Sequence, residues 1–158
     1  MLGGASDDFS HGQSRFLVAG HSVMFAPGAG GAHGVCIITH SRHRIHIGEP
    51  VVHNEFLITT HLYRKTKRLL LASAYFRQSD FGLAVFETQP QSLKQALRTE
   101  LATGDILLLG TDGNCNVGSA TCAIENAALG DFGGTFRDAR GEAMLRFCLL
   151  HKLCLKNT

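Results

Sequence analysis

Short apolar runs separated by polar or glycine-rich breaks dominate the first half of the chain. They contain many β-branched and aromatic residues, which favour strands. Lys65-Thr66-Lys67 predicts a hairpin turn that leads into a buried strand at residues 68–76. The earlier apolar runs lie at residues 16–18, 23–25, 33–39 and 55–63. The pattern therefore predicts a β-rich first half.

Residues 40–47 alternate between basic and apolar positions, which on an extended chain places them on opposite faces. A basic face of this kind can follow a phosphate backbone, and this makes Arg42 and Arg44 candidate nucleic-acid contacts. The alternative is a solvated, charged edge that discourages aggregation. The basic positions are His40, Arg42, Arg44 and His46.

In the second half the apolar spacing changes to that of helices. Pro90 suits the first turn of a helix predicted over residues 90–102. Residues 106–109 read as a buried central strand, and residues 138–151 as a last helix followed by a strand that begins at Leu153. Strand pairs followed by strand–helix–strand predict a mixed sheet layered with helices.

The predicted strand at residues 106–109 runs directly into a turn that presents Asp112 and Asn114, within a long loop predicted over residues 111–136. Side chains at i and i+2 of an extended chain point the same way, so an acid and an amide here can act on one phosphodiester. Asp, Gly and Asn also favour turns for purely local reasons. From the residues alone, both readings stay open.

Composition limits the class of protein more than it reveals function. The chain has 158 residues, 44% of them apolar, which is enough for one modest domain. A net charge of +2 is too weak to argue for nucleic-acid binding by itself. The five cysteines include no C-x-x-C pair, so we expect free, mostly buried thiols. With no signal-peptide or membrane-span pattern, we expect an intracellular protein, nuclear or cytoplasmic.

Several segments match, in order, the motifs of one superfamily. The chain resembles the endonuclease/exonuclease/phosphatase superfamily, and within it the apurinic-type endonuclease domain of non-LTR, LINE-like retrotransposons and their craniofacial-development-protein-like relatives. The resemblance covers residues 16–158, which leaves residues 1–15 as a disordered lead-in. The matching segments are 34–37 (GVCI), 72–79 (ASAYFRQS), 112–118 (DGNCNVG), 137–147 (RDARGEAMLRF) and 153–158 (LCLKNT).

The resemblance implies a fold and a site. The fold is α/β, a partial four-layered α/β sandwich of the DNase I-like kind with mixed, mainly antiparallel sheets. Asp112 matches the acid that orients or deprotonates the attacking water, Asn114 the amide that helps hold the phosphate, and Tyr75 a tyrosine that contacts the scissile phosphate. Arg77 and Asn116, in the same motifs, are candidate nucleic-acid contacts. The Tyr75 position alone reads equally well as a core aromatic with a wet hydroxyl.

The same resemblance implies Mg²⁺ as cofactor, DNA as substrate and a neighbouring reverse-transcriptase domain in a parent polyprotein. The metal-binding Glu and the Asp and His segments of the family have no counterpart in this sequence, so no metal ligand is assigned and the domain is expected to be incomplete at both ends. Thr111, Gly113 and Arg77 also depart from the family's residues.

Three functions are therefore open. They are a Mg²⁺-dependent DNA-nicking enzyme, a catalytically silent remnant of one, and a nucleic-acid-binding module without chemistry. The phosphatase and exonuclease branches of the superfamily are further alternatives.

Overall fold

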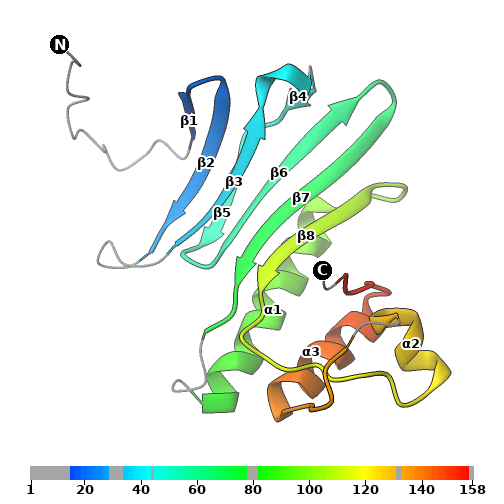
Figure 1. The fold of residues 1–158 in the computed structure, drawn as a ribbon. Helices are drawn as coiled ribbons and strands as arrows, with labels where there is room; N and C mark the ends of the chain where they lie inside the picture. Colours follow the sequence, from blue (N-terminus) through cyan, green and yellow to red (C-terminus); the bar gives the residue numbers. More distant parts are fainter. Residues whose placement is uncertain (1–14, 29–33, 44, 78–81, 131–132, 157–158) are drawn as a thin grey trace. The chain divides into compact units, whose positions relative to one another are not determined.

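The computed structural model describes residues 15–28, 34–43, 45–77, 82–130 and 133–156 (Figure 1). The chain forms two compact units: the first comprises Met1–Ser73 and Ala102–Gly110, the second Ala74–Leu101 and Thr111–Thr158. Of the lead-in expected at residues 1–15, only Arg15 lies within the described residues, where it begins the first strand.

A three-stranded antiparallel sheet opens the first unit. It comprises β1 (Arg15–Val18), β2 (His21–Pro27) and β3 (Gly34–His40), in that order. Burial alternates along β2 and β3, as the period of two in a strand requires. Met24 and Val35 lie on the buried face. The strand predicted at residues 33–39 is confirmed as β3, and the apolar runs at residues 16–18 and 23–25 lie in β1 and β2.

The second sheet holds β4 (His46–Ile47), β5 (Val51–Asn54), β6 (Leu57–Arg64), β7 (Lys67–Tyr75) and β8 (Ile106–Asp112). Its order is β4-β6-β7-β8, and β5 also pairs with β6. The turn at residues 65–66 joins β6 to β7, as predicted. In Figure 1, β8 runs in the same direction as β7. The pairs β4–β6 and β5–β6 are antiparallel, so the sheets are mixed and mainly antiparallel.

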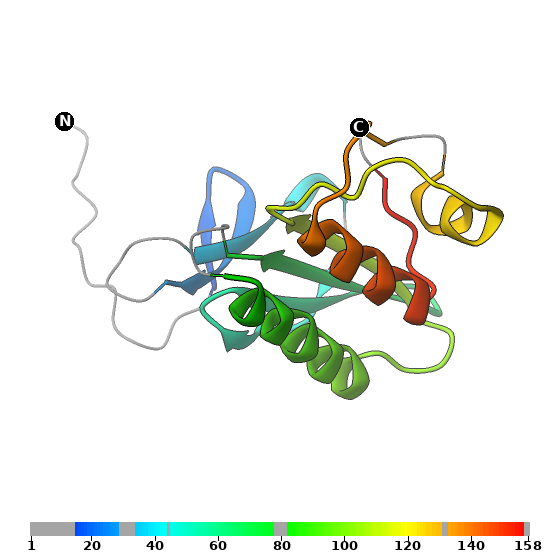
Figure 2. The same ribbon diagram turned by 90° about the horizontal axis from the view of Figure 1, so that it is seen from below.

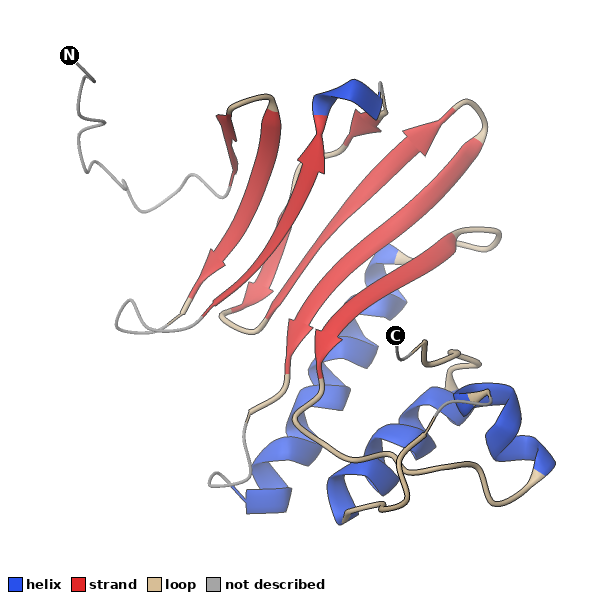
Figure 3. Ribbon diagram, in the orientation of Figure 1, coloured by secondary structure: helices blue, strands red, loops and turns tan. Residues whose placement is uncertain are grey.

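The two sheets of the first unit pack on each other through β2 and β3 on one side and β5 and β6 on the other. Leu57, Ile58 and Leu70 are buried in this unit. The strands are red in Figure 3. By residue range, the last two residues of β7 and of β8 (74–75 and 111–112) belong to the second unit.

The prediction of a buried central strand at residues 106–109 is wrong. Within the described residues β8 is the last strand of its sheet, and its Ile106 and Leu108 side chains are 57% and 59% exposed. An unbroken apolar run is typical of a strand covered on both faces. Which neighbours cover a strand is decided by tertiary structure, and here β7 is its paired neighbour.

The basic stripe predicted across residues 40–47 is not formed. β3 ends at His40, the short 3-10 helix η2 (Ser41–His43) follows, and β4 begins only at His46. The Ser41 N–H donates to the Gly20 carbonyl (2.9 Å), and the Arg42 N–H donates to His40 Nδ1 (3.0 Å). These bonds bend the chain, so the period of two is interrupted. Arg44 lies outside the described residues.

The second unit contains α1 (Gly82–Glu100), α2 (Ala123–Leu129) and α3 (Ala139–Leu150). Figure 2 shows α1 and α3 side by side. α3 confirms the predicted last helix, with Asp138 as its N-cap and His151 as its C-cap. The loop predicted over residues 111–136 contains α2 and begins inside β8, and residues 153–155 form no strand.

The start of α1 corrects the prediction made from Pro90. The helix begins at Gly82, and Pro90 lies in its interior. An interior proline removes one backbone hydrogen bond and costs about 3 kcal/mol. Phe86 is fully buried and Pro90 is buried as well, so packing of this helix outweighs the backbone penalty.

Two further observations concern the burial of the cysteines and the character of the helices. The expectation of mostly buried thiols is wrong, since Cys36, Cys122 and Cys154 are exposed and only Cys148 is buried among the five. In the part of the chain that the structure describes, no helix combines the length and the apolar character needed to cross a bilayer.

The position of β8 can be tested by comparing two leucines. We expect Leu70→Ala to lower the free energy of unfolding by about 2–5 kcal/mol, because Leu70 is fully buried. Leu108→Lys should change it by no more than about 0.5 kcal/mol, because that side chain is mostly exposed. Urea unfolding measures both. A loss from Leu108→Lys as large as that from Leu70→Ala would show that β8 is covered.

Candidate functional site

The ends of β7 and β8 are joined by two hydrogen bonds in the second unit. The Phe76 N–H donates to the Asp112 carbonyl (3.0 Å), and the Asn114 side-chain Nδ2 donates to the Phe76 carbonyl (2.7 Å). Both polar groups of the Phe76 backbone are thereby satisfied, one by the last residue of β8 and the other by Asn114 just beyond it. This bonding brings Tyr75, Asp112 and Asn114 into one neighbourhood.

Asp112 is exposed at the last position of β8. Its Oδ1 accepts a hydrogen bond from the Asn114 backbone N–H (3.2 Å), which makes a local Asx turn. Asn114 has a φ of +42°, so the chain turns here and the extended geometry expected for residues 112–114 is wrong. The two side chains do not share a strand face. Asn114 instead holds the Asp112 carboxylate with its N–H and the β7 end with its side-chain amide.

Tyr75 is the last residue of β7 and is half-buried. The next residue, Phe76, is fully buried and packs on Phe86 of α1, with ring centroids 5.5 Å apart. The backbone beside Tyr75 is therefore held by an apolar contact as well as by the bonds to the β8 end. Its assignment as a phosphate contact stays a prediction.

Two residues that the sequence analysis missed hold the segment after Tyr75. Gln89 of α1 accepts from the Arg77 N–H through Oε1 (2.8 Å) and donates through Nε2 to the Tyr75 carbonyl (3.3 Å). Arg140 of α3 donates to the Arg77 carbonyl (2.6 Å) and lies 4.9 Å from the Phe86 ring centroid. Arg140 belongs to a matched motif, but Gln89 precedes the helix start predicted at Pro90, so no sequence signal marked it.

Asn116 binds the start of α3. Its backbone N–H and its side-chain Nδ2 both donate to Asp138 Oδ2 (3.1 and 3.2 Å). Asp138 Oδ1 accepts from the Gly141 N–H, which caps the helix. Burial raises the pKa of Asp138, but the hydrogen bonds from Gly141 and Asn116 outweigh it and leave that pKa below its ordinary value. The exposed Asn116 thus has a structural role, and its nucleic-acid contact stays a prediction.

Arg137 ties the long loop to α3. Its guanidinium donates to both oxygens of Glu125 in α2 (3.0 and 2.8 Å), to Glu142 in α3 (3.2 Å) and to the carbonyls of Val117 and Ser119 (2.7 and 2.9 Å). The hydrogen bonds from Arg137 and from the Thr121 N–H lower the pKa of Glu125 to about 2. These contacts fix the residues that follow the Asp112 turn.

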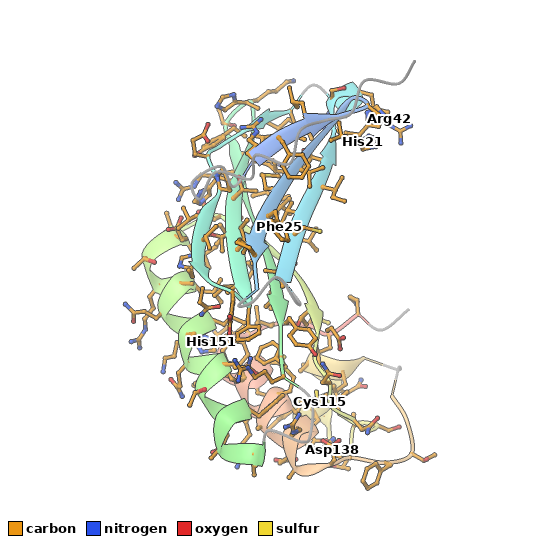
Figure 4. All side chains as sticks on the ribbon, turned by 90° about the vertical axis from the view of Figure 1, so that its left-hand side faces the viewer. His21, Phe25, Arg42, Cys115, Asp138 and His151 are labelled. Atoms are coloured by element: carbon orange, nitrogen blue, oxygen red, sulfur yellow. The ribbon has the colours of Figure 1, made fainter. Side chains whose placement is uncertain are left out.

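Gly113 stands where the resembled family has a bulky aromatic residue. A Cβ at this position would lie 3.2 Å from the Cys115 sulfur and 3.8 Å from the Met144 Cε atom, so those side chains occupy the adjoining space. Burial, followed by the nearby Asp138 carboxylate, raises the pKa of Cys115 to about 11. Figure 4 shows Cys115 and Asp138 close together. Cys115 is therefore a thiol at neutral pH and unsuited to act as a nucleophile.

The remaining basic candidates lie apart in the sequence. Arg42 is exposed on η2 in the first unit, where Figure 4 shows it close to His21. Arg77 is half-buried in the second unit, and its backbone is held by Gln89 and Arg140. Both stay predictions as nucleic-acid contacts. Arg77 directly follows Phe76, whose backbone is bonded to Asp112 and Asn114.

The fit to Mg²⁺ depends on the side chains that could bind the ion. Among the described residues, no three or more His, Cys, Asp or Glu side chains gather into a group that could hold a metal. Asp112 is exposed and bonded to the Asn114 backbone. The described residues do not by themselves fit a magnesium site.

The fold is similar to that of a solved nuclease domain. The structure matches the endonuclease domain of TRAS1, a telomere-specific non-LTR retrotransposon, with a TM-score of 0.56 and 15% sequence identity. The match covers 83% of this chain and 52% of that one, so the chain spans about half the length of the structure that it matches. No protein-family model and no curated protein sequence matches the chain. The mixed α/β, DNase I-like architecture is thereby confirmed.

The close approach of α3 to the loop after Asp112 can be tested at Gly141. A Cβ on Gly141 would collide with the Asn116 carbonyl, and that oxygen also accepts the Asp138 N–H. We expect Gly141→Ala to lower the free energy of unfolding by about 3 kcal/mol or more. Gly134→Ala is the control, because a Cβ there meets no atom within 4 Å. Equal effects of the two substitutions in urea unfolding would contradict this packing.

The Arg137–Glu125 contact predicts a dependence of stability on acid pH. A carboxyl with a lowered pKa stabilises the folded state above its ordinary pKa of 4.5, and that contribution is lost as pH falls toward about 2. Glu125→Gln should therefore be less stable than wild type above pH 4.5, and the two stabilities should converge near pH 2. Urea midpoints measured across this range test it, and a constant difference would refute it.

Proposed function

We propose that this chain is part of an endonuclease-type domain that hydrolyses phosphodiester bonds in DNA. The proposal depends on one observation above all: an exposed carboxylate, Asp112, held at the joined ends of β7 and β8 beside Tyr75. The similarity to the TRAS1 endonuclease domain supports it through the fold. A parent polyprotein with a reverse transcriptase, and an intracellular location, are part of the same proposal.

Asp112 is proposed to act as the general base. Its exposed carboxylate can accept a proton from a water molecule that attacks phosphorus. The Asn114 N–H that donates to Oδ1 holds the carboxylate in one orientation. A positioned base gains rate because the reacting groups no longer have to find their geometry by diffusion.

Tyr75 is proposed to donate its hydroxyl hydrogen bond to a phosphate oxygen as negative charge grows there. Neutral donors aimed at developing charge stabilise a transition state without reorganising. Because the Asn114 Nδ2 group donates to the Phe76 carbonyl, we assign Asn114 the support of Asp112 and of the strand end. Arg77 and Asn116, next along the same two segments, are proposed to contact the DNA backbone.

Mg²⁺ is proposed as cofactor, and when bound it would neutralise charge on the phosphate. None of the steps above passes through the ion, since the described residues do not fit a magnesium site. We expect this chain alone to nick DNA slowly or not at all, because the sequence offers no counterpart to the family's metal-binding Glu or to its Asp and His segments.

Nicking of supercoiled plasmid by the purified chain tests this function. Reactions contain Mg²⁺ or EDTA, and Asp112→Ala and Asp112→Asn are run beside the wild type, with Asp7→Asn as a control for a change of charge. We expect slow nicking or none, and any nicking by the wild type should be reduced at least about 100-fold by both Asp112 variants. Nicking that is unaffected by both substitutions would remove Asp112 from the reaction.

DNA binding without cleavage is the second candidate, favoured by the exposed Arg42. Duplex binding by fluorescence anisotropy at several salt concentrations separates it from the first. Binding that weakens with salt, together with an absence of nicking, would support a binding module. A chain that neither binds nor nicks would contradict both functions.

A further inference from the structure

We propose that Gln89 is a positioning residue that fixes Tyr75 at the candidate site, and this inference rests on the function proposed above. Gln89 lies on α1 and contacts the backbone on both sides of Phe76. It belongs to none of the segments that resemble the nuclease family. Its assignment comes from the hydrogen bonds of the second unit alone.

The Gln89 side chain forms the two backbone hydrogen bonds that a neighbouring strand would otherwise form. In an extended segment, the carbonyl of residue i and the N–H of residue i+2 point to the same side, and the groups of residue i+1 point to the other. Gln89 donates to the Tyr75 carbonyl and accepts from the Arg77 N–H, so one side-chain amide bonds both backbone groups on that side of the segment. On the opposite edge, Phe76 is bonded to the Asp112 carbonyl and to Asn114 Nδ2.

The helix that carries Gln89 is well anchored in the second unit. Phe86, one turn earlier, is fully buried against Phe76, and Pro90, the next residue, is buried as well. Arg140 is also buried, with 7% of the residue exposed. Its guanidinium lies against the Phe86 ring and donates to the Arg77 carbonyl. A well-packed helix therefore holds the end of β7, together with the bonds from Phe76 to Asp112 and Asn114. A catalytic group displaced by about 1 Å can lose roughly 100-fold in rate.

The chemistry requires an amide at position 89. One atom must accept from an N–H while another donates to a carbonyl, and among side chains of this length only glutamine does both at neutral pH. In Gln89→Glu an ionised carboxylate keeps the acceptor but faces the Tyr75 carbonyl with a second oxygen. Protonation of that carboxyl, near pH 4 for an ordinary glutamate, would restore a donor. In Gln89→Leu both bonds are lost at every pH.

The composition of the chain gives a direct spectroscopic measurement. It has two tyrosines, Tyr63 in β6 and Tyr75 in β7, and no tryptophan. With 3-fluorotyrosine incorporated, ¹⁹F NMR should give two signals, which Tyr63→Phe assigns. Gln89→Leu and Gln89→Glu at pH 7 should shift or broaden the Tyr75 signal and leave the Tyr63 signal unchanged. Amide exchange at Arg77 should accelerate roughly tenfold or more, since its acceptor is lost.

Gln95→Leu is the matched control, because Gln95 lies on the same helix and its side chain is exposed. It should leave the Tyr75 signal and Arg77 exchange as in the wild type. A Tyr75 signal and an Arg77 exchange rate unchanged by Gln89→Leu would overturn the proposal. If Gln89→Leu disturbs both tyrosine signals, Gln89→Glu decides: recovery of the Tyr75 signal between pH 7 and pH 4 supports the proposal, and its failure to recover overturns it.

Plasmid nicking separates this inference from the proposed function. If the wild type nicks through Asp112, Gln89→Leu should lower kcat roughly 10- to 100-fold with KM little changed, and an unchanged kcat would overturn the positioning role. If no chain nicks, the proposed function fails, and the ¹⁹F and exchange results still decide whether Gln89 fixes Tyr75.

Discussion

The hydrogen bonding of the Phe76 backbone is the constraint on which the candidate site depends. Its N–H and its carbonyl are both taken up by the segment that ends β8, through the Asp112 carbonyl and the Asn114 amide. Unpaired backbone groups at a strand end are costly when they are removed from water. Because Asn114 satisfies one of them with its side chain, an exposed acid, Asp112, is held next to the end of β7.

A second set of contacts fixes the chain that leaves this turn. Asn116 is bound to the Asp138 cap of α3, and Arg137 joins the loop to the carboxylates of α2 and α3. Gly141 lets the helix approach the Asn116 carbonyl so closely that no side chain fits between them. The loop departs from the resembled family at Gly113, yet it is held by hydrogen bonds, ion pairs and close packing.

The fold that these contacts stabilise is similar to that of the TRAS1 endonuclease domain. The fold is shared at 15% identity, and the chain spans about half of the matched structure. Low identity with a common fold is expected when core positions keep their apolar character while individual residues change. Function is carried by a site and not by a fold, so the nuclease assignment depends on what Asp112 does.

Local patterns in the sequence determined strands β3, β6 and β7, the hairpin turn at residues 65–66 and the capped helix α3, because each follows from short-range propensity and turn chemistry. The motif at residues 112–118 located the turn after β8. Only tertiary structure decided that β8 lies at an edge, that α1 extends across Pro90 and that Gln89 reaches the β7 end. Those outcomes depend on which distant elements cover a residue or supply its hydrogen-bond partner, and no local pattern encodes that.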